Sequence, residues 1–215
     1  MNLDLFTDNT TQPCELICAG ANLLRGFALQ YEADLLRDIN QIISIKPPRT
    51  MYTPSGLPMS VITTSCGDVG WVSDARGYRY SKRDIHSQQD WPTMPESFLK
   101  LAQHAAKTTG FLNFSPDSCL INCYNVGAKM SLHQDKDEKD FSQPIVSVSL
   151  GLPATFLLGG LLRTDKTTKV YLTHGDVVVW GASARLFFHG VLPVKTGHHP
   201  LLGNQRINLT FRKAL

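Results

Sequence analysis

The chain has 215 residues, of which 42% are hydrophobic and 18% are charged, a composition typical of one globular core. Its net charge of +3 is compatible with a polyanionic partner but is too small to indicate one. No apolar run approaches the roughly 20 residues of a membrane span. The polar, acidic start MNLDLFTDNTTQ is unlike a secretory signal peptide.

The five cysteines include two C-x-x-x-C pairs, at residues 14/18 and 119/123. This spacing raises the question of a zinc site, but Cys119 and Cys123 belong to the strand-like run CLINCYNV, which has no tight turn between them. We therefore expect free, mostly buried thiols, and hence a cytoplasmic protein.

Two helices are predicted in the first half of the chain. Residues 31–44 carry Leu35, Leu36, Ile39 and Ile43 at helical spacing and are followed by two prolines. Residues 95–110 begin with a proline in a first-turn position, have an apolar stripe, and end at a glycine. Between the helices, residues 49–92 form a polar and aromatic section whose best strand is MSVITTS.

After residue 116 the sequence consists of short β-branched or aromatic runs separated by Gly, Pro and Asp. The runs are SCLINCYNV, IVSVSLGL, TFLLGG, TKVYLTH, DVVVWG, RLFFHG and RINLTFR. Successive short strands without helices between them predict a mostly β fold, an antiparallel sandwich or jelly roll, with the two helices supporting one sheet. Since no linker or repeat is visible, residues 1–215 are predicted to form a single domain.

The stretch SLHQDKDEKD places His133 and Asp135 one residue apart, so that in an extended chain their side chains point the same way. His189 ends the aromatic run RLFFHG and could return to the same end of a barrel. Two histidines and one carboxylate are the ligand set of non-heme Fe(II) oxygenases. The alternative is that His133 lies in a surface loop and that His189 is a hydrogen-bonded residue at the end of a strand.

The run RINLTFR strengthens the metal hypothesis. Arg206, Asn208, Thr210 and Arg212 share one face, and the other face is purely apolar and must be buried. Two arginines directed into a barrel require an anionic partner, and a dicarboxylate supplies two charges that can each accept a bidentate contact. The alternative is an amphipathic edge strand with solvated arginines.

Taken together, these runs resemble the bacterial AlkB family of alkylation-repair dioxygenases. The resemblance extends over almost the whole chain and is most specific in HQDKDE and RINLTFR. It implies a double-stranded β-helix (jelly-roll) core at about residues 116–213, an N-terminal helical buttress, and a nucleotide-recognition lid at about residues 49–92. It also implies Fe(II), 2-oxoglutarate as cosubstrate, and O₂.

The same resemblance assigns roles to individual residues. The implied iron ligands are His133, Asp135 and His189, and the implied 2-oxoglutarate site consists of Asn122, Tyr124, Arg206, Asn208 and Arg212, with Arg212 also counted as catalytic. The implied reaction is oxidative demethylation of N-alkylated bases such as 1-methyladenine and 3-methylcytosine, which releases formaldehyde, succinate and CO₂. The implied substrate is alkylated DNA, single- or double-stranded, or RNA, and the protein is expected to be a monomer.

A base methylated on its Watson–Crick edge must be flipped out of a duplex or be single-stranded, and aromatic rings hold such bases. The segment GWVSDARGYRYSKRD interleaves Trp71, Tyr78 and Tyr80 with four cations. The resemblance makes Trp71 the stacking residue and places both tyrosines near the nucleotide backbone. The alternative is a surface hairpin whose aromatics cover a small satellite core.

Asp137 has the same parity as His133 and Asp135, so an extended run would place it near the metal. A carboxylate there would favour cationic methylated bases, and the alternative is one more acidic residue in a solvated run. The resemblance adds a polar contact from Arg163. Thr63 stands where it leads us to expect a larger apolar side chain, which leaves lesion preference open.

Two other functions remain compatible with the sequence. One is a 2-oxoglutarate oxygenase that acts on a protein or small molecule, against which Trp71 and Asp137 argue. The other is a non-catalytic jelly-roll module that holds a metal, against which the two inward arginines argue. The sequence does not rank DNA against RNA.

Overall fold

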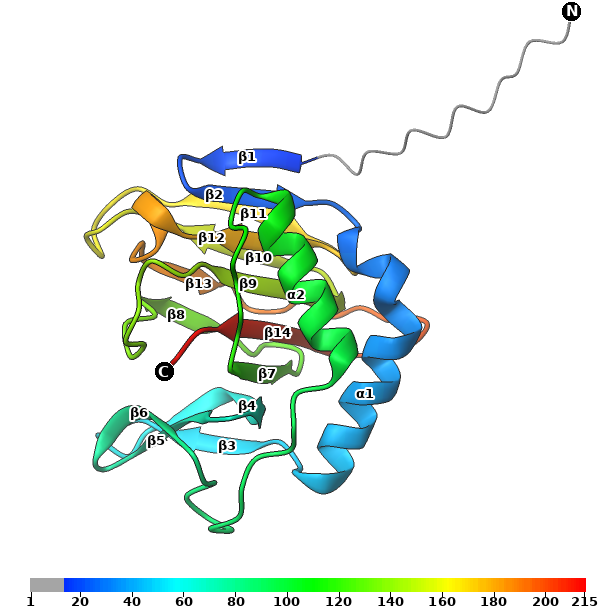
Figure 1. The fold of residues 1–215 in the computed structure, drawn as a ribbon, viewed down its shortest axis with the longest axis vertical. Coiled ribbons are helices and arrows are strands. Elements are labelled where there is room, and N and C mark those ends of the chain that lie inside the picture. Colours follow the sequence, from blue (N-terminus) through cyan, green and yellow to red (C-terminus); the bar gives the residue numbers. More distant parts are fainter. Residues whose placement is uncertain (1–13) are drawn as a thin grey trace, which may run out of the picture.

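In a computed structural model, which describes residues 14–215, two β-sheets face each other and two helices cover the larger one (Figure 1). The polar start of the chain lies outside the described residues. The larger sheet has the strand order β1-β2-β12-β9-β14-β7-β4-β3, and the smaller one has the order β11-β10-β13-β8. The C-terminal runs predicted an antiparallel sandwich or jelly roll, and the double-stranded β-helix that the resemblance implies is confirmed.

The strands of the larger sheet are β1 (Cys14–Cys18), β2 (Ala21–Leu24), β3 (Arg49–Tyr52), β4 (Pro58–Gly67), β7 (Ser118–Tyr124), β9 (Ile145–Gly151), β12 (Val177–Trp180) and β14 (Arg206–Arg212). Those of the smaller sheet are β8 (Met130–His133), β10 (Ala154–Leu158), β11 (Thr168–Leu172) and β13 (His189–Val191). A separate hairpin consists of β5 (Gly70–Asp74) and β6 (Gly77–Ser81).

The predicted helices are confirmed as α1 (Glu32–Ile45) and α2 (Glu96–Thr108). Their apolar faces pack with the outer face of the larger sheet, where Phe98 meets Phe211 of β14 edge to face. In α1, Ile42 is fully buried and Ile43 only partly so, which shifts the predicted stripe by one residue. Neither helix in the described part of the chain has the length and apolar character that a membrane crossing requires.

Apolar and polar side chains alternate strictly along β14, because its two faces meet different surroundings. In β14, Ile207, Leu209 and Phe211 join the core beneath the helices, whereas Arg206 and Arg212 face the space between the two sheets. The predicted division of this strand into an apolar and a polar face is therefore confirmed.

One predicted strand is wrong in its extent. Residues 185–188 of the run RLFFHG do not form a strand, and His189 begins β13 instead of ending a strand. A short 3-10 helix, η2 (Ala182–Ala184), precedes this segment, and the backbone N–H of Phe187 bonds back to Ala184 in a turn. Residues 185–188 therefore have the composition of a strand, but their backbone forms a turn and an irregular segment.

Strands β1, β2 and β8 and the 3-10 helix η1 (Phe27–Tyr31) were not predicted. The larger sheet therefore also recruits strands from outside residues 116–213, on both of its edges. All five cysteines are free thiols, and Cys119 and Cys123 lie buried near the two ends of β7.

Candidate metal centre and ligand pocket

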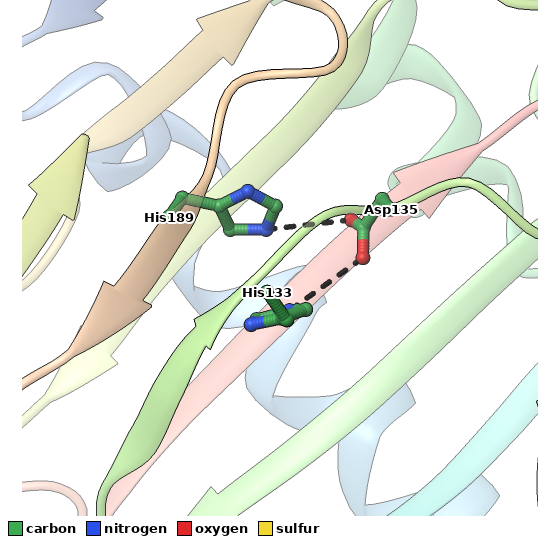
Figure 2. Close-up of side chains that lie close together, drawn as sticks. All are labelled: His133, Asp135 and His189. Carbon is green, nitrogen blue, oxygen red and sulfur yellow. Dashed lines mark ion pairs between the residues drawn. The ribbon is translucent and has the colours of Figure 1, made fainter. Parts of the chain in front are cut away.

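Two neighbouring strands of the smaller sheet bring the candidate metal ligands together. His133 ends β8 and is the direct partner of His189 in β13, and Asp135 follows two residues after β8 (Figure 2). One ligand atom from each of the three residues lies within 4.8 Å of the others. The Asp135 carboxylate lies 3.6 Å from His133 Nε2 and 3.7 Å from His189 Nε2.

Backbone carbonyls orient both imidazoles. Nδ1 of His133 lies 2.9 Å from the carbonyl oxygen of Ser131, and Nδ1 of His189 lies 3.0 Å from that of Phe187. An Nδ1–H that donates to a carbonyl leaves the Nε2 lone pair free for a metal, which is the usual arrangement of a histidine ligand. Both Nε2 atoms face Asp135, so the three residues have the chemistry and the spacing of a metal site.

Gly190 allows the two histidine strands to approach closely. A Cβ at this position would lie 2.7 Å from the carbonyl oxygen of Met130, a distance that packed atoms do not tolerate. Any larger residue would therefore push β13 away from β8 and separate His189 from His133.

The charged groups at this centre shift one another's pKa values. Burial favours the protonated form of Asp135, but Arg212 and the two histidines outweigh it and hold the pKa of this carboxyl well below its usual range. Burial lowers the pKa of His189 to about 4, so the imidazole is neutral near pH 7 and is available as a ligand. The centre therefore offers an ionised carboxylate from Asp135 and a neutral imidazole from His189.

A cavity of about 680 Å³ opens from this centre between the two sheets. Its lining includes His133, Asp135 and His189 together with the polar face of β14. Several buried polar atoms on its walls have no hydrogen-bond partner within residues 14–215: Thr63 Oγ1, Asn122 Oδ1, Trp180 Nε1, and Nε and Nη1 of Arg206. Buried polar groups are normally paired, so this cluster indicates a polar ligand.

Arg206 is the clearest of these groups. Its side chain is 1% exposed, and its one hydrogen bond is from Nη2 to Ser149 Oγ, at 3.0 Å. Burial lowers its pKa, because the cation has lost water without gaining a full set of partners. A carboxylate bound beside Nε and Nη1 would supply them.

The second arginine of β14 is used differently. Arg212 donates from Nε and Nη2 to Asp135 Oδ2, at 2.9 and 2.6 Å. Its burial would lower its pKa, but Asp135 outweighs that effect and raises it. The expectation that both arginines need an anionic partner is met within the protein for Arg212, whereas Arg206 has no hydrogen bond to a carboxylate among the described residues.

The other residues expected at a 2-oxoglutarate site also line the cavity. Asn208 is occupied within the protein, since its Nδ2 bonds to Ser147 and Val148 and its Oδ1 accepts from Asn122 and Thr210. The Arg206 guanidinium lies over the Tyr124 ring, with its Cζ 5.7 Å from the ring centroid. Burial raises the pKa of the Tyr124 phenol to about 12. Asn208 therefore positions its neighbours, and Asn122 keeps a free acceptor.

The β5–β6 hairpin contributes two aromatic residues to the wall of the cavity. Trp71 and Tyr78 line the cavity, and their rings stack with centroids 5.6 Å apart. Trp71 Nε1 donates to Asp137 Oδ2 at 2.8 Å, and Asp137 lines the same cavity. Arg163 also lines it, stacks over Phe188 and donates to the carbonyl oxygen of Leu132.

Tyr80 makes its hydrogen bond within the protein. It is not among the cavity-lining residues, and its hydroxyl donates to Glu138 Oε1 at 2.6 Å. Of the cations in this hairpin, Arg76 and Arg79 pair with Asp74. Those two guanidinium groups are therefore partly neutralised rather than free for a phosphate.

Sequence reasoning missed two charged residues of this region, Glu138 and Arg185. Both side chains are almost fully buried and form an ion pair of 3.1 Å. The available signal was weak: Glu138 ends the acidic run HQDKDE, and Arg185 interrupts an otherwise apolar stretch.

Comparisons with known proteins agree with this geometry. The chain matches the 2OG-Fe(II) oxygenase superfamily over residues 20–212. It is 54% identical over 213 residues to the alpha-ketoglutarate-dependent dioxygenase AlkB of Escherichia coli, covering 99% of this chain and 98% of that protein. An AlkB homolog of Caulobacter vibrioides is 47% identical over 167 residues, 77% of this chain and 73% of that protein. The solved structure of OsALKBH1 superimposes with a TM-score of 0.81 at 30% identity, covering 94% of this chain and all of that one.

Proposed function

Because the chain belongs to the 2OG-Fe(II) oxygenase superfamily, we propose that it is an Fe(II)- and 2-oxoglutarate-dependent dioxygenase that removes alkyl groups from nucleic-acid bases. The 54% sequence identity to the AlkB of Escherichia coli, over 99% of this chain, supports this reaction class. The observation that carries the proposal is the joint presence, in one cavity, of the three-residue metal centre and the buried, underpartnered Arg206.

The residues present fit both implied groups. His133, Asp135 and His189 would hold the ion, and the chemistry that Fe(II) supplies with 2-oxoglutarate and O₂ is oxidation of an N-alkyl carbon. Arg206 would bind the carboxylate of 2-oxoglutarate remote from the metal, supported by Tyr124 beneath its guanidinium, and Asn122 would hold Asn208 in place beside them. Arg212 would hold Asp135 and meet the carboxylate nearer to the ion.

The hairpin and the acidic run would bind the base. Trp71 offers a ring face at the mouth of the cavity, suited to stacking on a base that has left its helix. Asp137 places a carboxylate beside that ring and would favour cationic bases such as 1-methyladenine and 3-methylcytosine. Arg163, which also lines the cavity, would make a polar contact. A flipped base fits DNA of either strand state and also RNA.

The direct test is mass spectrometry of a single-stranded oligonucleotide containing 1-methyladenine, incubated with protein, Fe(II), 2-oxoglutarate and O₂. We expect loss of 14 mass units, which is one CH₂, with formation of succinate, and no change when any one component is omitted. Glu96→Gln, on the exposed face of α2, is a matched control that should keep full activity. Succinate formation with an intact oligonucleotide would contradict the assignment of the substrate.

A further inference from the structure

Glu138 is a buried carboxylate to which the proposed reaction assigns no role. Its side chain is 2% exposed. Oε1 accepts the hydroxyl of Tyr80 at 2.6 Å and lies 3.4 Å from Arg212 Nε, and Oε2 accepts from Arg185 Nη2 at 3.1 Å. A buried charge is kept only where it is paired, and Glu138 is paired on both oxygens.

The two arginines that meet at Glu138 also hold Asp135 at both of its ends. Arg212 binds the Asp135 carboxylate, and Arg185 Nη1 donates to the Asp135 backbone carbonyl oxygen at 2.8 Å. Glu138 thus fixes the direction of both guanidinium groups. Groups that orient a metal ligand in this way commonly change metal affinity when they are lost.

The third partner of Glu138 comes from the hairpin. Tyr80 of β6 is the direct cross-strand partner of Trp71 of β5. Trp71 bonds to Asp137, and Tyr80 bonds to the next residue, Glu138. The Trp71–Asp137 contact is exposed, so an entering base can replace it, whereas the Tyr80–Glu138 contact is largely shielded from solvent.

We propose that Glu138 is a positioning residue that orients Asp135 through Arg212 and Arg185, and that Tyr80 anchors the β5–β6 hairpin to Glu138. This proposal rests on the proposed iron site. The network has two buried carboxylates and two buried guanidinium groups, so it is internally neutral before any ion binds. Tyr80 is therefore part of the support of the metal centre, and the exchangeable contact at the cavity mouth is that of Trp71.

Cobalt binding tests the role of Glu138 without turnover. Co²⁺ is titrated into metal-free protein, without 2-oxoglutarate or nucleic acid, by calorimetry and by visible absorption. Glu138→Gln keeps the shape and removes the charge, so we expect Co²⁺ binding to weaken about 10- to 100-fold, with shifted absorption bands. The matched control Glu96→Gln should leave both unchanged. Binding within twofold, with the same bands, would overturn the proposal.

Tyr80→Phe tests the anchor by deleting one oxygen atom, and it remains decisive if Glu138→Gln fails to fold. We expect amide hydrogen exchange in residues 70–81 to accelerate about tenfold while the larger sheet is unaffected. Tyr171→Phe, an exposed tyrosine of β11, is the control. Unchanged hairpin exchange would overturn the anchor. An unaltered protein that binds Co²⁺ but leaves methylated oligonucleotides intact would refute the proposed function alone.

Discussion

Replacement of Arg206 by methionine should separate cosubstrate binding from folding. Methionine keeps most of the length and volume of the side chain but removes the charge. Within residues 14–215, Arg206 makes a single side-chain hydrogen bond, and its Nε and Nη1 have no protein partner. The substitution therefore removes a buried cation that is poorly compensated until a ligand is bound.

The size of the effect follows from the two free donors. A hydrogen bond between charged groups contributes about 1.5–3 kcal/mol, so two such bonds to a carboxylate contribute about 3–6 kcal/mol. Their loss would weaken 2-oxoglutarate binding about 100- to 20,000-fold. The unliganded protein should be as stable as before or more so, because replacing a buried ion by an apolar side chain is often neutral or stabilising.

The assay is urea unfolding with and without 2-oxoglutarate, in the presence of Mn²⁺ in place of iron. The ligand should raise the free energy of unfolding of the unaltered protein and of the control Arg25→Met, but not that of Arg206→Met. Arg25 lies outside the cavity, where it pairs with Asp176 and Glu15. The reasoning is refuted if Arg206→Met binds 2-oxoglutarate normally, or if it loses stability without ligand.

Three further outcomes are expected. Because burial holds the pKa of His189 at about 4, against about 6.5 in an unfolded chain, the unfolded state alone takes up this proton between those values. The free energy of unfolding should therefore be highest above pH 6.5 and fall by about 3 kcal/mol as the pH drops to 4. Urea unfolding of metal-free protein should show this decrease, and His189→Gln should reduce the dependence on pH. Asp137→Asn should lower kcat/KM for a 1-methyladenine oligonucleotide about fivefold, because a partly screened attraction to the cationic base is lost. The kcat/KM for neutral 1-methylguanine should stay unchanged. Equal losses for the two bases in competition assays would contradict the role of Asp137. His133→Ala should weaken Co²⁺ binding more than 100-fold by calorimetry, since it removes a ligand itself and not only its support, and retained affinity would exclude it from the metal centre.

The sequence predicts the site well where the pattern is local. His133, Asp135 and Asp137 share a parity, and the alternation of β14 separates Arg206 and Arg212 from the apolar residues between them. Both patterns need only the direction of side chains along an extended chain. Their convergence in one cavity is confirmed, as are the two helices that cover the sheet.

What the sequence does not predict depends on tertiary contacts. Residues 185–188 have a strand-like composition, but their backbone turns. No local pattern predicts that Arg185 pairs with Glu138, which is 47 residues away in the sequence. Likewise, Tyr78 and Tyr80 have the same parity in β6, and the sequence does not predict that Tyr78 lines the cavity while the Tyr80 hydroxyl donates to Glu138.

The pairing of β8 with β13 also bears on how the empty protein behaves. Among the strands of the smaller sheet, β8 lies at an edge and is joined only to β13. An ion held by His133 and His189 would tether that edge much as a covalent crosslink does. Loss of the ion would then release this edge, and a protease should cut the chain between residues 130 and 138 more readily in the metal-free protein.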